Sequence, residues 1–159
     1  HTYDGPVDEA FCPQSITLRL EHDIDVSRGQ MIIGTDDLPG ANSDLRAKIC
    51  WMHPRALTAG RKFLLKHTTL NTKAVVTEIS HRIDITTLEP GEAPDGLELN
   101  DLGEIRLRTA QPLVYDGYHD NRLTGAFILV EPGTHATVAA GMLLPPKSVV
   151  KPDDADFVI

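Results

Sequence analysis

The stretch NRLTGAFILVEPGTHATVAAGML, residues 121–143, decides the fold of this 159-residue chain. An apolar run, AFILV at residues 126–130, is followed by EPGT at residues 131–134 and then by small and β-branched residues, ATVAA at residues 136–140. Two such runs joined by a short turn containing Pro and Gly are typical of a β-hairpin. We therefore expect this hairpin to close a small β-barrel.

Three segments upstream of the hairpin, residues 15–20, 44–52 and 104–109, alternate apolar and polar side chains. This period of two predicts half-buried strands. Trp51, the only tryptophan, falls on the apolar face of the second segment, and we expect it to anchor a core or a domain interface. No window keeps helical spacing over ten residues, so the predicted fold class is all-β.

Other strands are predicted with less regular patterns. Residues 63–65 form a short apolar run, and residues 74–83 are expected to form a long strand. Strict alternation would place Val75, Thr77 and Ile79 on one face of that strand. Residues 112–115 begin with proline, which cannot donate to a ladder, so an edge strand is expected there. Residues 89–100, rich in Pro, Gly and acids, are expected to be an exposed loop.

The composition excludes several classes of protein. No run of about 18 apolar residues is present, and the first ten residues lack the form of a signal peptide, so the expected location is the cytoplasm. The net charge of −8 argues against a large phosphate-binding surface. Cys12 and Cys50 lack metal-ligand spacing; we interpret them as ordinary reduced thiols, and a disulfide between them is the open alternative.

Charge is distributed unevenly along the chain. Residues 43–82 carry eight Lys or Arg against two Asp or Glu, whereas the segments on both sides are acidic. Strands of a barrel interleave in space, so this basic block is either a surface patch or an asymmetry that disappears on folding. The sequence leaves both alternatives open.

The sequence contains no recognisable catalytic or nucleotide-binding motif. A P-loop requires GxxxxGK followed by Ser or Thr, and the nearest candidate, residues 34–40, has the wrong spacing and no lysine. Neither a guanine-reading NKxD motif nor a GxSxG nucleophile elbow is present. His81 with Asp84 and His119 with Asp120 do not form a dense ligand cluster, so His81 is expected to be a partly buried structural residue. We predict no catalytic, cofactor or metal site in this chain.

Two stretches nevertheless resemble a known family. Ser27-Arg28-Gly29 follows an acidic turn, as at the end of the second barrel of elongation-factor-Tu-like GTPases. Arg122, TGAF at residues 124–127 and AGM at residues 140–142 are similar to the closing hairpin of the third domain of these proteins. The sequence of these stretches is most similar to that of the GTPase (large) subunit of bacterial sulfate adenylyltransferase.

The resemblance implies a domain organisation. It implies a compact six-stranded, Greek-key-like antiparallel barrel of the elongation-factor-Tu domain III type at residues 44–143. Residues 1–34 would be the last strands of a preceding domain-II-like barrel, and residues 35–43 a linker. Residues 144–159 would be a tail or a linker, and a following adenylyl-sulfate kinase domain would suit such a linker.

The resemblance also implies a function for the complete protein. In that family, a GTPase subunit pairs with a catalytic small subunit that converts ATP and sulfate to adenylyl sulfate and diphosphate. GTP, Mg and ATP would serve the complete enzyme, and this chain would couple the upstream GTPase domain to the small subunit without being catalytic. The rival interpretations are a translation-factor-like barrel that binds tRNA or RNA, and a free-standing structural barrel.

Eight polar or small residues match the third-domain pattern and are the expected partner-interface residues. They are Arg82, Asp84, Asn100, Asp116, Tyr118, Arg122, Thr124 and Gly125. The alternative for each is a structural role, because polar side chains at strand ends can brace turns through local hydrogen bonds. Arg82 and Arg122 are the strongest candidates, since guanidinium groups suit ion pairs across an interface.

Overall fold

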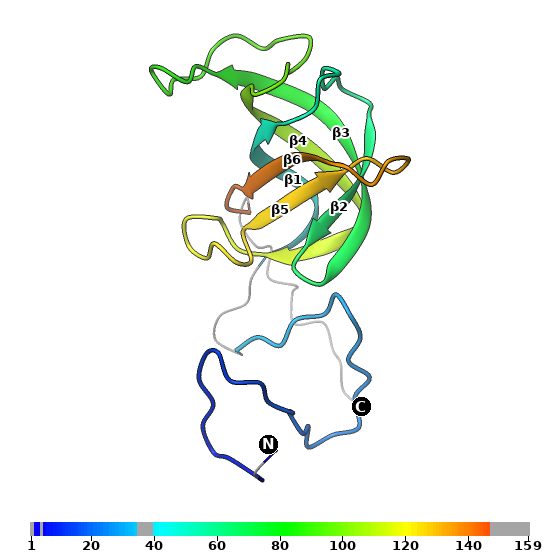
Figure 1. Cartoon of the computed structure of the whole chain (residues 1–159), viewed down its shortest axis with the longest axis vertical. Coiled ribbons are helices and arrows are strands. Elements are labelled where there is room, and N and C mark those ends of the chain that lie inside the picture. The colour runs from blue at the N-terminus through cyan, green and yellow to red at the C-terminus, as the bar shows by residue number, and fades with distance from the viewer. Residues whose placement is uncertain (1, 4, 35–39, 147–159) are drawn as a thin grey trace, which may run out of the picture.

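Six antiparallel β-strands form a closed barrel in the computed structural model, which describes residues 2–3, 5–34 and 40–146 (Figure 1). The order around the barrel is β1-β4-β3-β2-β5-β6, and β6 pairs with β1 to close it. The prediction of an all-β, six-stranded antiparallel barrel is confirmed. No helix among the described residues has the length and apolarity needed to cross a membrane. The strands are β1 (Gly40–Trp51), β2 (Lys62–His67), β3 (Leu70–Ile83), β4 (Leu102–Tyr115), β5 (Ala126–Val130) and β6 (Thr137–Leu143).

The topology contains a Greek key. Strands β2, β3 and β4 follow one another as antiparallel neighbours, and β1 returns to lie beside β4. The β2–β3 turn has only two residues, of which Thr68 has a φ of 49°. Strands β5 and β6 form the hairpin predicted from the sequence.

The barrel interior is filled by side chains that alternate along the strands. The predicted inward face of β1 is confirmed, and Trp51 is fully buried, with its Nε1 donating to the Arg55 carbonyl at 3.0 Å. Ile105 and Leu107 of β4 point into the same core, as predicted. The largest buried side chains are Trp51, Phe63, Leu45, Ile49, Leu57, Leu65, Leu97, Ile105, Leu107, Leu113, Leu129 and Leu143.

The predicted common face of β3 is wrong. Thr72, Ala74, Val76 and Ile79 are buried, whereas Val75 faces outward and is half-buried. The pairing register with β4 shifts between Val76 and Glu78 and again after Ile79. Each β-bulge inserts an extra residue and therefore reverses the alternation that strict parity predicts.

The predicted edge strand at residues 112–115 is also wrong. These residues are the end of β4, where Leu113 pairs with Asn42 of β1 and is fully buried. A closed barrel has no edge strand. Pro112 lies beyond the last β3–β4 pair, Ala74 with Thr109. No residue of β3 therefore needs a hydrogen bond from the N–H group that proline lacks.

The N-terminal segment, residues 5–34, contains no β-strand in this structure. The half-buried strand predicted at residues 15–20 is not formed, and Ile16, Leu18 and Leu20 are 38%, 61% and 47% exposed. An alternating segment needs a neighbouring strand before it can bury one face, and no described residue pairs with it. Strand β1 begins at Gly40, inside the expected linker. Residues 35–39 of that linker and residues 147–159 of the expected tail lie outside the described part.

Candidate functional site

The eight residues expected at partner interfaces are divided between the two ends of the barrel. Arg82, Asp84 and Asn100 lie where β4 begins, beside the 84–101 connection, and we call this region the upper end. The other five lie in the 116–125 connection, where β4 has ended, beside the β2–β3 turn; this region is the lower end (Figure 1). The chain therefore presents two separate surfaces rather than one site.

At the upper end, Asp84 and Asn100 shape turns. Asp84 Oδ1 accepts hydrogen bonds from the backbone N–H groups of Thr86 and Thr87 at 2.7 and 3.1 Å, and these bonds lower the pKa of Asp84 below its ordinary value. Asn100 has a φ of 69°, and its N–H donates to the Trp51 carbonyl at 2.7 Å. The side-chain bonds of Asp84 are the turn-bracing role that the sequence left open as an alternative, whereas the contact of Asn100 is made by its main chain.

Arg82 is an exposed cation at the upper end. Its Nη1 lies 3.7 Å from Asp101 Oδ1, and its side chain is 58% exposed. An exposed pair at this distance contributes little to stability. The guanidinium group can therefore contact a partner at low cost.

At the lower end, a partly buried network connects the β2–β3 hairpin to the 116–125 connection. Thr124 Oγ1 donates to Asp116 Oδ2 at 2.6 Å, and the Thr124 carbonyl lies 2.6 Å from His67 Nε2. His67 is 1% exposed. Sequence reasoning missed His67, although it continues the inward alternation of Phe63 and Leu65 along β2. Two of the expected residues, Asp116 and Thr124, are thus joined by a hydrogen bond.

Gly125 and Tyr118 hold the shape of the same connection. The Gly125 N–H donates to the Asn121 carbonyl at 2.8 Å, and the Tyr118 N–H donates to the Leu143 carbonyl at 2.9 Å. A Cβ at Gly125 would overlap the Tyr118 backbone. Only glycine fits at this position. Arg122, in contrast, is exposed and makes no hydrogen bond or ion pair with a described residue.

The N-terminal segment contacts the barrel at the lower end. The Gly29 N–H donates to Thr69 Oγ1 in the β2–β3 turn at 3.1 Å. Gly29 has a φ of 99°, and a Cβ there would lie 2.9 Å from Leu70 Cδ1. Leu70 packs on the barrel core. The Ser27-Arg28-Gly29 motif is therefore the point at which this segment is attached to the barrel.

A hollow of about 460 Å³ lies beside this attachment point. The N-terminal segment supplies one wall, including Met31, and the lower-end residues Thr69, Asp116 and Thr124 supply the other. The partly buried network at the lower end thus faces the segment that precedes the barrel.

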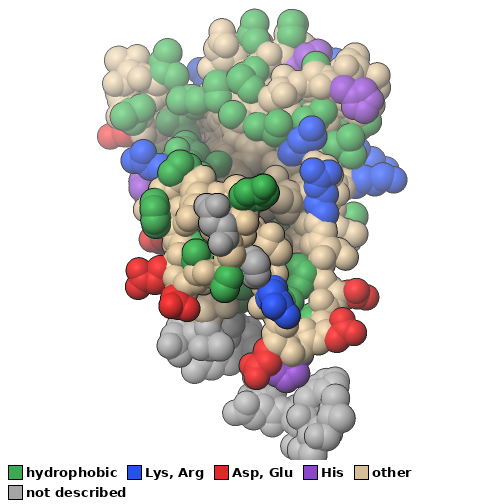
Figure 2. Space-filling view, turned by 60° about the horizontal axis from the view of Figure 1, so that its bottom comes forward, with side chains coloured by type: hydrophobic (Ala, Val, Ile, Leu, Met, Phe, Trp, Pro, Cys, Tyr) green, Lys and Arg blue, Asp and Glu red, His purple; other side chains and the backbone are tan. Residues whose placement is uncertain are grey.

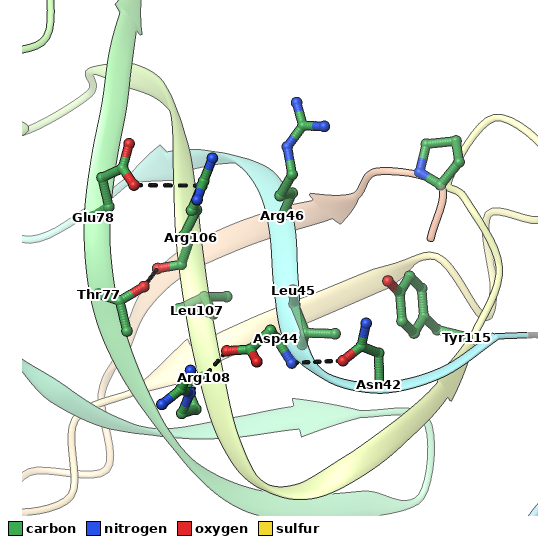
Figure 3. Close-up of a pocket in the computed structure, with 11 residues that line it drawn as sticks. Asn42, Asp44, Leu45, Arg46, Thr77, Glu78, Arg106, Leu107, Arg108 and Tyr115 are labelled. Carbon is green, nitrogen blue, oxygen red and sulfur yellow. Dashed lines mark hydrogen bonds and ion pairs between the residues drawn. The ribbon is translucent and has the colours of Figure 1, made fainter. Parts of the chain in front are cut away.

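The outer face of β1, β4 and β3 carries a second hollow, of about 530 Å³ (Figure 3). Arg106 Nε lies 3.4 Å from Glu78 Oε2, and Arg108 Nε lies 2.8 Å from Asp44 Oδ1. The contact with Asp44 raises the pKa of Arg108. Arg46, at the rim, pairs with Glu104 at 2.7 Å. Because each arginine has its own carboxylate, this face is charge-balanced.

The described residues offer no converging ligand set for a metal ion. No three His, Cys, Asp or Glu side chains among them are grouped to hold one. His81 is half-buried, with Nε2 at 3.9 Å from Glu104 Oε2. Cys12 is exposed and Cys50 is half-buried, and both are free thiols.

Comparison with known proteins places the barrel in a family. The sequence profile described as "GTP-eEF1A C-terminal domain-like" matches residues 44–144. The chain belongs to this family, whose boundaries coincide with the six-stranded barrel within a few residues.

The relatives point to a particular protein within that class. The chain is 45% identical over 143 residues to the bifunctional enzyme CysN/CysC of Rhodopirellula baltica, covering 90% of this chain and 22% of the relative. It is 44% identical to the enzyme of the same name from Mycobacterium tuberculosis, covering 89% and 23%. It is 39% identical to sulfate adenylyltransferase subunit 1 of Alteromonas mediterranea, covering 90% and 30%. The predicted resemblance to the large subunit of bacterial sulfate adenylyltransferase is confirmed, and the chain spans about a quarter of these relatives.

Solved structures support the fold. A crystal structure of sup35 complexed with GDP matches with a TM-score of 0.63 and 22% sequence identity, covering 69% of this chain and 27% of that chain. A second structure of sup35, complexed with GMPPNP, matches with a TM-score of 0.64 and 21% identity, covering 70% and 27%. At this identity the match concerns the barrel fold alone.

Proposed function

We propose that this chain is the non-catalytic C-terminal region of the large subunit of a GTP-dependent sulfate adenylyltransferase. In this role the barrel couples an upstream GTPase domain to the catalytic small subunit, which forms adenylyl sulfate and diphosphate from ATP and sulfate. The observation that carries the proposal is the 37–45% identity to sulfate adenylyltransferase subunit 1 and CysN/CysC over about 90% of the chain.

The nucleotides belong to other parts of the complete enzyme in this proposal. The chain contains no P-loop, and the described residues form no strand–loop–helix unit that could hold phosphates. GTP and Mg would bind the upstream domain, and ATP would bind the small subunit. The names of the CysN/CysC relatives support a further partner, an adenylyl-sulfate kinase domain in the same polypeptide. The complete protein would act in the cytoplasm, where both nucleotides are available.

The barrel suits a mechanical role because its interior is filled. Large side chains from all six strands meet in one core, and a packed core moves as a rigid body rather than deforming. Movement of the upstream domain would enter at the lower end, where Gly29 contacts Thr69. Residues 1–34 would belong to an adjoining barrel whose remaining strands precede them, which would cover Ile16, Leu18 and Leu20.

The test uses the complete enzyme with its small subunit and replaces Arg122 by Ala. Arg122 has no hydrogen bond or ion pair with a described residue, so the substitution leaves the barrel intact. We expect a severalfold weaker stimulation of adenylyl sulfate synthesis by GTP, since loss of one interfacial ion pair costs about 1 kcal/mol or more. Lys48→Ala, at an exposed cation on β1, is the matched control and should leave the stimulation unchanged.

Two results would contradict the proposal at different levels. If the complete protein makes no adenylyl sulfate with any small subunit encoded beside it, the assignment to sulfate adenylyltransferase is wrong. If synthesis occurs but GTP stimulation and subunit affinity are unchanged by Arg122→Ala, Arg122 is not an interface residue.

A further inference from the structure

The basic block found in the sequence becomes a surface feature on β2 and β3. Arg46, Arg61 and Arg82 have carboxylate partners at 2.7, 3.3 and 3.7 Å. The lysines of β2 and β3 instead remain exposed on the outside of the barrel. Figure 2 shows Lys and Arg side chains gathered along the flank on which β2 lies in Figure 1. The charge asymmetry of the sequence therefore survives folding in part.

The strand register arranges this flank as a checkerboard of cations and apolar side chains. In one row Lys62 pairs with Val75, which pairs with Arg108. In the next row Leu64 pairs with Lys73, and Ala110 follows two residues after Arg108 on β4. These residues, with Pro132 of the β5–β6 turn, line a hollow of about 520 Å³ that we call the basic groove.

The charges of the basic groove are not balanced. Neither Lys62 nor Lys73 makes a hydrogen bond or ion pair with a described residue. Strand β2 contains no acid, and the single acid of β3, Glu78, pairs with Arg106 outside the groove. The neighbouring hollow on β1 and β4 differs, since each of its arginines has a carboxylate partner.

We propose that the basic groove is a docking site for an acidic segment of a second protein that also carries aliphatic side chains. Carboxylates of such a segment would pair with Lys62 and Lys73, and its aliphatic groups would cover Leu64 and Val75. An extended segment presents every second side chain to the groove, so an acid and an aliphatic residue two positions apart would meet a lysine and a neighbouring apolar side chain.

The chemistry of the groove disfavours two other occupants. A nucleic acid would offer phosphates to the lysines but nothing aliphatic to Leu64 and Val75, and the one aromatic residue at the groove, Phe63, is buried and unable to stack on bases. A second copy of the chain would bring the same cations face to face in a two-fold contact, and like charges repel. This inference goes beyond the proposed function and does not depend on it.

Fluorescence anisotropy of a labelled peptide tests the proposal on the full chain. The probe is fluorescein-Asp-Asp-Leu-Val-Leu-Asp-Asp-amide, labelled at its N-terminal amine, and its counterpart carries Lys in place of each Asp. We expect saturable binding of the acidic peptide alone, weakened about tenfold or more by Lys62→Glu with Lys73→Glu, because each reversal replaces an attraction by a repulsion. Val75→Thr, which keeps the shape but adds a hydroxyl, should weaken binding about threefold. Lys48→Glu, compared with Lys62→Glu alone, is the control for net charge and should change nothing.

Each other result would overturn the proposal. Equal loss of binding in Lys48→Glu and in Lys62→Glu alone would mean attraction to net charge rather than to a groove. Tighter binding after Asp153→Asn, Asp154→Asn and Asp156→Asn together would mean that acids of this chain compete for the site. Displacement of the peptide by polyuridylic acid at equal charge concentration would assign the groove to nucleic acid. Thermal unfolding of every variant confirms that the barrel is intact.

Discussion

The barrel and the N-terminal segment contain the same pattern of side chains with opposite outcomes. Residues 104–109 alternate apolar and polar side chains, and Ile105 and Leu107 are 0% and 1% exposed. Residues 15–20 alternate just as regularly, but Ile16 and Leu18 are 38% and 61% exposed. The difference lies in the neighbours, because β4 pairs with both β1 and β3, whereas no described residue pairs with residues 15–20.

This contrast shows what alternation can and cannot determine. The pattern states which face of a strand could be buried, and burial then requires partner strands that a barrel supplies from elsewhere in the chain. The N-terminal segment is attached to the barrel through Gly29 alone among the hydrogen bonds between described residues. Substitutions in the two regions should therefore have very different effects.

The largest difference is expected for a matched pair of leucine truncations. Leu107→Ala should reduce the free energy of unfolding by about 3 kcal/mol, since it opens a cavity in a filled core. Leu18→Ala should change it by less than about 0.5 kcal/mol because the side chain is exposed. Urea unfolding followed by the fluorescence of Trp51, the only tryptophan and fully buried, measures both. Equal losses would show that the N-terminal segment packs against the barrel in solution.

The next effect concerns glycines at filled and open positions. A Cβ at Gly141 would overlap the Phe127 ring, whereas a Cβ at Gly34, in the N-terminal segment, would meet nothing within 4 Å. Gly141→Ala should cost about 2 kcal/mol of stability through overpacking, and Gly34→Ala almost nothing. Adding Phe127→Leu to Gly141→Ala should recover part of the loss. If the double variant is less stable than the sum of the single changes predicts, the clash with Phe127 is not the cause.

Two tyrosines, one in the barrel and one near the N-terminus, allow the regions to be compared through the pH dependence of stability. Burial raises the pKa of Tyr115 above the ordinary value of 10.0, whereas Tyr3 is fully exposed. A pKa raised in the folded state means that the stability is fully present below the unfolded pKa and is lost as the pH rises toward the folded pKa. The free energy of unfolding should therefore fall above about pH 10, by at most about 1.4 kcal/mol per pH unit.

Phenylalanine substitutions isolate this contribution. Tyr115→Phe should make the fall in stability above about pH 10 shallower, since the group that titrates differently in the two states is gone. Tyr3→Phe, at a fully exposed side chain, is the control for the substitution itself. Melting temperatures between pH 8 and pH 11 give the comparison, and identical profiles for all three proteins would mean that Tyr115 ionises as freely when folded.

The inward faces of β1 and β4 could be predicted because alternation is a local property of the sequence. The inward face of β3 could not, because its two bulges depend on how β4 pairs with it. His67 could have been found by continuing the alternation of β2, which places it inside after Phe63 and Leu65. Its bond to Thr124 could not, since the two residues are 57 positions apart and meet only when the barrel closes.

The expected interface residues show the same limit. The resemblance to a family identified Asp116 and Thr124, which the structure brings together at 2.6 Å. It did not reveal that Arg82 of β3 lies beside the opposite end of β4, because that separation follows from topology rather than from local sequence. The contact between Gly29 and Thr69 joins residues 40 positions apart, so it could not be predicted from the local sequence either.

The smallest effect is expected where the two regions meet. Thr69→Val keeps the shape of the side chain but removes the acceptor of the Gly29 N–H, an exposed hydrogen bond of 3.1 Å. Such a bond contributes about 0.5–1 kcal/mol, so the attached form of the N-terminal segment should become about two to five times less populated relative to the detached form.

Trypsin measures this change, because it cleaves after arginine and the bond between Arg28 and Gly29 lies at the contact. Cleavage there should accelerate about two- to fivefold in the variant, because proteolysis follows the population of the open form. Arg19, an exposed arginine of the same segment, provides an internal control whose cleavage rate should not change. Equal acceleration at both sites would mean that Thr69→Val loosens the whole segment or the barrel. Unchanged cleavage at Arg28 would mean that Leu70, which packs against Gly29 and the core, holds the segment without the hydrogen bond.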